Sequence, residues 1–169
     1  NVIKQSLNLK NEEEFKGANF SYLTIGKKAN DTLSKTEKII SNHSNVYDNL
    51  VYDEVAKVSE KIVEEFSLGN FDKVLIVFNS FKNAANQIVK TEQFLPIENI
   101  DETNKSGDYI FEPSMEQIVS ELVPKSLKIQ LFKSIRDSFA GEHGARMTAM
   151  HKATDNATEL RDELKLTYN

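Results

Sequence analysis

The chain has 169 residues, of which 39% are hydrophobic and 28% charged, with a formal net charge of −5 and no cysteine. This length and composition predict one folded domain with a real core and argue against global disorder, and the acidic balance gives no reason to expect nucleic acid as a partner. The lack of cysteine excludes disulfides and cysteine-based metal sites, and no apolar run in the sequence is long enough to predict a direct membrane span.

The first two-thirds of the chain alternate between helix and strand patterns. Val51, Val55, Val58, Ile62 and Phe66 recur at helical spacing, with Asp48 or Asn49 as the expected N-cap and Gly69 as the expected stop. The run from Lys73 to Phe78 is continuously apolar after its lysine, which is typical of a central strand covered on both faces. The alternation predicts an α/β domain with a partly parallel sheet. The expected helices are 2–15, 27–34 and 51–66, the expected strands are 20–25, 37–41, 73–78, 88–95 and 109–111, and 98–106 is an expected surface loop.

After Pro113 the pattern becomes purely helical. A short helix is expected over 115–122, and Pro124 fits the first turn of a second helix or a kink. From 125 to 168 there is no proline and no turn cluster, so the second helix is expected to be roughly 65 Å long and to project from its domain. We therefore expect two parts, 1–112 and 113–169. A first residue other than Met and an end still in helical register suggest a piece of a longer polypeptide.

The sequence around this helix also carries a recognisable motif. The run Ala-Gly-Glu-His-Gly-Ala-Arg-Met-Thr-Ala-Met at 140–150, followed by Ala-Thr-Asp-Asn at 153–156, resembles the C-terminal helix of the gamma subunit of rotary (F-type) ATP synthases, of the bacterial type. Further similar segments follow the family's order along nearly the whole chain. They are 23–28 (LTIGKK), 71–81 (FDKVLIVFNSF), 95–97 (LPI), 108–113 (DYIFEP) and 160–169 (LRDELKLTYN).

The resemblance implies a Rossmann-like layered domain and a long C-terminal helix that normally forms an antiparallel coiled coil. It implies a central-stalk rotor subunit of the proton-translocating ATP synthase, which couples c-ring rotation to conformational change at the catalytic beta subunits. The implied partners are the alpha and beta subunits, the epsilon subunit and the c ring. The implied location is the cytoplasmic face of the bacterial inner membrane, with no catalytic residue, cofactor or metal of its own.

The resemblance also assigns residues to three surfaces. The side facing the alpha/beta hexamer would comprise Glu142, Arg146, Met147, Met150 and Lys152. The foot near the c ring would comprise Ser126, Lys128, Gln130 and Lys133. The coiled-coil seam would comprise Ala145, Ala149, Ala153, Ala157, Leu160 and Leu164, in which the small residues let another helix approach closely.

Two glycines depart from the family pattern. Gly141 stands where the family often has Ser, and Gly144 where it has Ala. Because glycine in a helix costs about 0.5–1 kcal/mol relative to alanine, we expect this part of the helix to be locally softer.

Several features have plainer interpretations. Glu142 and Arg146 fit an exposed i,i+4 ion pair better than acid–base chemistry, and His143 and His151 are too far apart for an obvious metal site. A basic cluster with only Asp137 opposing it nearby is either a solvated helix face or a surface near polar or acidic loops of the c ring or near lipid head groups. It consists of Lys125, Lys128, Lys133 and Arg136. Two alternatives stay open, a free-standing α/β module that binds an anion at 26–28 and a coiled-coil adaptor unrelated to rotation.

Overall fold

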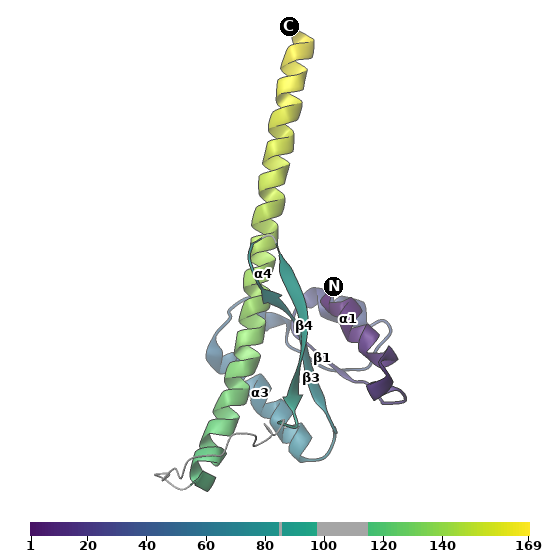
Figure 1. The fold of residues 1–169 in the computed structure, drawn as a ribbon, viewed down its shortest axis with the longest axis vertical. Coiled ribbons are helices and arrows are strands. Elements are labelled where there is room, and N and C mark those ends of the chain that lie inside the picture. Colours follow the sequence, from purple (N-terminus) through teal and green to yellow (C-terminus); the bar gives the residue numbers. More distant parts are fainter. Residues whose placement is uncertain (85, 98–114) are drawn as a thin grey trace, which may run out of the picture.

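One helix, α4 (Met115–Tyr168), runs the length of the molecule, and the remaining elements pack around its first half (Figure 1). The computed structural model describes residues 1–84, 86–97 and 115–169. With 54 residues, α4 is about 80 Å long. The two helices expected around Pro124 are therefore one. Proline lacks the N–H of one ladder bond, but the helix continues because Leu127 and Leu131, in the next two turns, are held in the core.

The N-terminal segment is more broken than the expected helix over 2–15. It consists of α1 (Val2–Asn8) and two 3₁₀ turns, η1 (Leu9–Asn11) and η2 (Glu13–Phe15). Side-chain contacts hold it to the rest of the domain: Lys10 pairs with Glu37, and the Tyr22 hydroxyl donates to the Ser6 carbonyl over 3.4 Å. Leu9 is also buried, so the segment is held to the domain by apolar burial as well as by these polar contacts.

A small parallel sheet follows. β1 (Tyr22–Thr24) pairs in parallel with β2 (Ile39–Asn42), and α2 (Lys27–Leu33) forms the crossover between them. The turn into α2 depends on Gly26, whose φ of 111° is in the region that favours glycine. The ring of Tyr47, from the 3₁₀ turn η3 (Ser44–Tyr47), lies where a Cβ on Gly26 would point, at 3.3 Å. The expected partly parallel sheet is thus confirmed.

Helix α3 (Tyr52–Ser67) carries the predicted apolar stripe, in which Val55 and Val58 are buried. Its expected C-terminal stop is confirmed: the Gly69 N–H donates to the Phe66 carbonyl and the Asn70 N–H to the Glu65 carbonyl, which is the Schellman pattern. The expected N-cap is wrong, because Val51 occupies that position without a side-chain cap. Asp48 instead closes the preceding turn η3.

The second sheet is an antiparallel hairpin. β3 (Val74–Phe81) pairs with β4 (Gln87–Leu95) along its whole length. The predicted apolar run is a strand, as expected, but it is not covered on both faces. Most side chains of β3 are half-buried, and only that of Phe78 is buried. Within the described residues its pairing partner is β4 alone, so the apolar run is covered mainly by packing against α4.

The core lies where η3, α3, β4 and the first half of α4 meet. Leu127, Leu131 and Ile135 supply a stripe of large residues from α4. They pack with buried residues of the other elements, which are Val46, Val55, Val58, Phe94 and Leu95. Half of the long helix is thus part of the domain, and the structure confirms an α/β fold with a long C-terminal helix. The expected loop over 98–106, the strand over 109–111 and the boundary at 112/113 lie outside the described residues.

One buried polar group in α3 gives a direct test of the packing. Ser59 is 1% exposed, and its Oγ has no hydrogen-bond partner among the described residues. Replacing Ser59 with alanine is expected to raise the free energy of unfolding by about 1 kcal/mol, because it removes an unsatisfied buried hydroxyl. Urea unfolding measures the change. Ser134→Ala is the matched control: Ser134 is 2% exposed but donates to the Gln130 carbonyl over 2.9 Å, so its loss should not stabilise.

Candidate interaction surface on the long helix

The outer half of α4 is not covered by the other described residues of its domain. Every residue from 149 to 169 is exposed, and in Figure 1 this part stands clear of the other elements. Its exposed side chains include large apolar ones, such as Leu160 at 57% and Leu164 at 61%. No helix of the described part of the chain has the length and apolar character to cross a membrane. Exposed apolar residues at helical spacing are typical of a surface that another element covers.

The predicted seam lies along one side of this outer half. Its alanines recur every fourth residue, so they share a helix face, and all four are exposed. Leu160 and Leu164 continue the same face toward the C-terminus. On this face the small side chains lie nearer the domain and the large ones nearer the C-terminus. A second helix could therefore approach the backbone closely along the alanines and bury apolar surface against the leucines. The members are Ala145, Ala149, Ala153, Ala157, Leu160 and Leu164.

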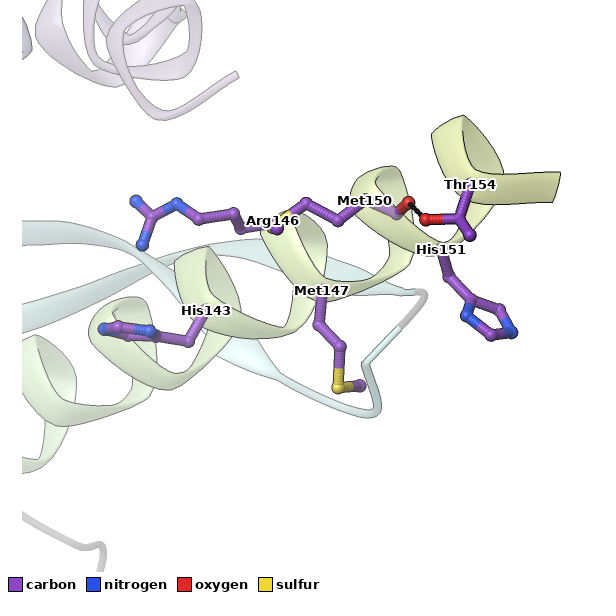
Figure 2. A pocket seen from close by; sticks show the side chains of 6 residues that line it. All are labelled: His143, Arg146, Met147, Met150, His151 and Thr154. Atoms are coloured by element: carbon purple, nitrogen blue, oxygen red, sulfur yellow. Dashed lines mark hydrogen bonds between the residues drawn. The ribbon is translucent and has the colours of Figure 1, made fainter. Parts of the chain in front are cut away.

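A neighbouring face holds three of the five residues predicted to meet the hexamer. Met147 and Met150 are 62% and 64% exposed, and with Arg146 they line a shallow, open depression (Figure 2). The other lining residues are His143, His151 and Thr154. Glu142 and Lys152 are also exposed but lie outside this group. The combination of flexible apolar methionines with a cationic arginine suits an apolar partner surface that also carries negative charge.

The base of this face is tied to the domain by aromatic contacts. Tyr47 stacks on Phe139 with 5.9 Å between ring centroids, and the His143 ring meets Phe139 edge-on at 4.4 Å. Burial, and secondarily the Glu142 carboxylate, raises the pKa of the Tyr47 phenol. Glu142 also forms the predicted i,i+4 ion pair with Arg146, both side chains being more than half exposed, so the pair contributes only a few tenths of a kcal/mol.

The residues predicted for the foot divide into two groups. Ser126 and Lys133 are exposed on α4. Lys128 instead pairs with Glu60 of α3 at 2.6 Å, a hydrogen bond that raises the pKa of the lysine, and the Gln130 amide donates to the Gln93 carbonyl over 3.2 Å.

The basic cluster is less isolated than the sequence suggests. Lys125 lies 3.5 Å from Glu121 of α4, and Lys128 pairs with Glu60 of α3. Two carboxylates therefore oppose the basic cluster in addition to Asp137. The expectation of a single nearby opposing charge is wrong for two reasons: Glu121 lies one helical turn before Lys125, and the partner of Lys128 comes from α3, 68 positions away in the sequence. Among the described residues, no group of three or more His, Asp or Glu side chains is placed to hold a metal ion.

A third face of α4 is covered by a contact that the sequence analysis missed. The tip of the β3–β4 hairpin lies against Gly141 and Gly144, and the Thr148 hydroxyl donates to the Ala84 carbonyl over 3.3 Å. The sequence offered a signal, two glycines inside a helix, but glycine alone does not distinguish a soft helix from a close approach. The structure gives both glycines a packing role.

Comparison with known proteins shows which family the chain resembles. A family model described as ATP synthase matches residues 1–169. The ATP synthase gamma chains of Flavobacterium psychrophilum and Flavobacterium johnsoniae are 59% and 56% identical, over 100% of this chain and 59% of each relative. That of Geobacter metallireducens is 37% identical over 100% of this chain and 60% of the relative. The chain thus spans about three-fifths of the length of these curated relatives.

Solved structures show a similar fold. A chain from the central stalk and c ring of the Tetrahymena thermophila mitochondrial ATP synthase has a TM-score of 0.62 at 21% identity, covering 90% of this chain and 67% of that one. A chain from the rotor of the Euglena gracilis mitochondrial ATP synthase has a TM-score of 0.60 at 15% identity, covering 100% of this chain and 68% of that one. The family model matches residues 1–169, and the alignments to the gamma chains of the two Flavobacterium species include the whole of this chain. The chain therefore belongs to the gamma-subunit family of F-type ATP synthases.

Proposed function

We propose that this chain is part of the central-stalk rotor subunit of a proton-translocating ATP synthase and couples rotation of the c ring to conformational change at the catalytic beta subunits. The observation that carries the proposal is the outer half of α4, which is exposed from 149 to 169 and presents two different faces. The seam face suits a partner helix in an antiparallel coiled coil. The face around Arg146, Met147 and Met150 suits the surrounding alpha and beta subunits.

The mechanism proposed is mechanical and involves no chemistry by the chain itself. An asymmetric helix contacts each beta subunit differently, so it stabilises a different conformation at each catalytic site. A ligand or partner shifts a conformational equilibrium only through such differential contacts. Turning the helix passes the contacts from one site to the next, and ATP chemistry remains with the partner subunits.

At the other end of α4, we propose that the exposed Ser126 and Lys133 lie near the c ring and the epsilon subunit. Lys128 and Gln130 remain in the proposed foot as residues that hold α4 to α3 and β4, which is what their contacts support. The subunit would then stand at the cytoplasmic face of the bacterial inner membrane, attached through its partners.

Reconstitution tests the proposal. The full-length subunit, wild type or Arg146→Ala, is combined with the matching alpha and beta subunits, and complex formation and ATP hydrolysis are measured. We expect a stable complex whose turnover requires this subunit and falls about tenfold with Arg146→Ala, since a desolvated charged contact is lost at the interface.

Lys57→Ala is the matched control. Lys57 is also an exposed cation in a short-range ion pair, with Glu54 at 2.6 Å, but it lies on α3 within the domain. ATP hydrolysis by the complex that contains the Lys57→Ala variant should stay at the wild-type level. Absence of a complex, or equal turnover for Arg146→Ala and Lys57→Ala, would count against the assignment. In the first case, titration with phosphate or nucleotides would examine the anion-binding alternative.

A further inference from the structure

The tip of the β3–β4 hairpin covers one face of α4 around residues 141–144, where the other faces of the helix are exposed. Gly141 is buried and Gly144 half-buried, whereas Glu142, His143 and Ala145 between and beside them are exposed. The Gln87 side chain donates from Nε2 to the Gly141 carbonyl over 2.5 Å, and the Thr148 hydroxyl is shared between the Gly144 carbonyl of its own helix at 3.0 Å and the Ala84 carbonyl at 3.3 Å. One face of the helix is therefore occupied here by a segment 54 to 64 positions earlier in the chain.

The absence of side chains at 141 and 144 makes this approach possible. A Cβ on Gly144 would lie 3.0 Å from the Ala84 Cα and 3.3 Å from its carbonyl oxygen, both backbone atoms of the hairpin. A Cβ on Gly141 would lie 3.1 Å from the Gln87 Cγ. Ordinary contacts between carbon atoms are about 3.5–4.0 Å, so any side chain larger than a methyl at 144 displaces the tip.

The contact continues down the hairpin toward the core. The Asn79 backbone N–H donates to the Ser138 Oγ over 3.0 Å, and the Gln130 amide holds the Gln93 carbonyl. Ile135 is the last buried apolar residue of α4 in the core, and Thr148 lies about 20 Å beyond it along the helix. The hairpin thus extends the support of α4 well past the hydrophobic core.

We propose that the tip of the β3–β4 hairpin is a clamp on α4, and that Gly141 and Gly144 are present to admit it. The clamp moves the point at which the helix leaves the domain from Ile135 to Thr148. It also provides a route for torque between the domain and the outer helix, through close packing and side-chain-to-backbone hydrogen bonds, a role that rests on the proposed function. The clamp itself consists of Phe81, Ala84 and Gln87 on the hairpin and Gly141, Gly144 and Thr148 on the helix.

Hydrogen exchange of the full-length subunit tests the clamp, because the clamp and glycine softness predict different responses of the hairpin amides to the same substitution. Valine is a better helix former than glycine, so a helix that is only soft should gain protection in Gly144→Val and leave exchange of the hairpin amides unchanged. The clamp predicts instead that Gly144→Val expels the tip and speeds exchange at least tenfold for the Asn83 and Asn86 amides, which bond to each other's carbonyls across it. Thr148→Val keeps the shape but loses the bond to Ala84, and should speed the same amides several-fold.

Lys152→Val is the control, since it places the same side chain at an exposed position on α4 and should leave the hairpin amides unchanged. Unchanged or slower hairpin exchange in Gly144→Val would overturn the clamp. If that variant does not fold, Thr148→Val decides the question by the same criterion. The measurement is made before assembly with other subunits, so its outcome is separate from that of the Arg146→Ala reconstitution.

Discussion

Replacing Phe94 with alanine is expected to lower the free energy of unfolding by about 3–5 kcal/mol, the usual cost of deleting a buried aromatic ring. Phe94 is 1% exposed and packs in the core among residues of α3, β4 and α4. Its removal leaves a cavity at the place where the domain holds the long helix. Urea unfolding followed by circular dichroism measures the change.

Ile88→Ala is the control for this experiment. Ile88 lies on the same strand but is 48% exposed, so its truncation should cost less than about 1 kcal/mol. If both substitutions cost the same, the ring of Phe94 is not in a close-packed core, and the arrangement of β4 against α3 and α4 would have to be revised.

The double substitution Leu160→Gln and Leu164→Gln is expected to have a large effect on assembly and almost none on the domain. Both side chains are more than half exposed, and glutamine is a good helix former, so the domain should unfold at the same urea concentration as wild type. If a partner helix covers the seam, losing two buried leucines removes about 3–6 kcal/mol of apolar burial. Reconstitution with alpha and beta subunits should then give a much smaller yield of complex.

A matched pair on the polar face of the same turns separates burial from general surface effects. Arg161→Gln and Lys165→Gln have the same spacing and introduce the same residue, and both positions are exposed. Wild-type assembly is expected for this pair. Equal yields for the two double variants would contradict a seam at Leu160 and Leu164.

The elements that follow from strong local patterns could be predicted from the sequence. The stripe through Val55 and Val58 and the stripe through Leu127, Leu131 and Ile135 each have a clear helical period, and both became buried faces. Gly69 ended α3 as expected because its positive φ suits glycine. The ion pair between Glu142 and Arg146 follows from spacing alone.

Features that depend on distant parts of the chain could not be predicted in this way. The apolar run of β3 indicated a strand but not its neighbours, so its one-sided pairing was missed. Lys128 looked like a free basic residue because Glu60 is far away in the sequence. For the same reason Gly144 suggested softness, since nothing near it in the sequence reveals the Ala84 backbone against it. The residues proposed to meet other subunits stay predictions.

The continuity of α4 has a geometric consequence. The same uninterrupted helix packs against the domain along its first half and extends to the far end of the molecule, so a reorientation of the domain also reorients the outer half of the helix. The free arm beyond Thr148 is roughly 30 Å long, and tilting it by a tenth of a radian moves its end by about 3 Å. That displacement approaches the distance over which a side-chain contact is made or lost. Changes too small to repack the core would therefore be amplified into a change of contacts at the end of the helix.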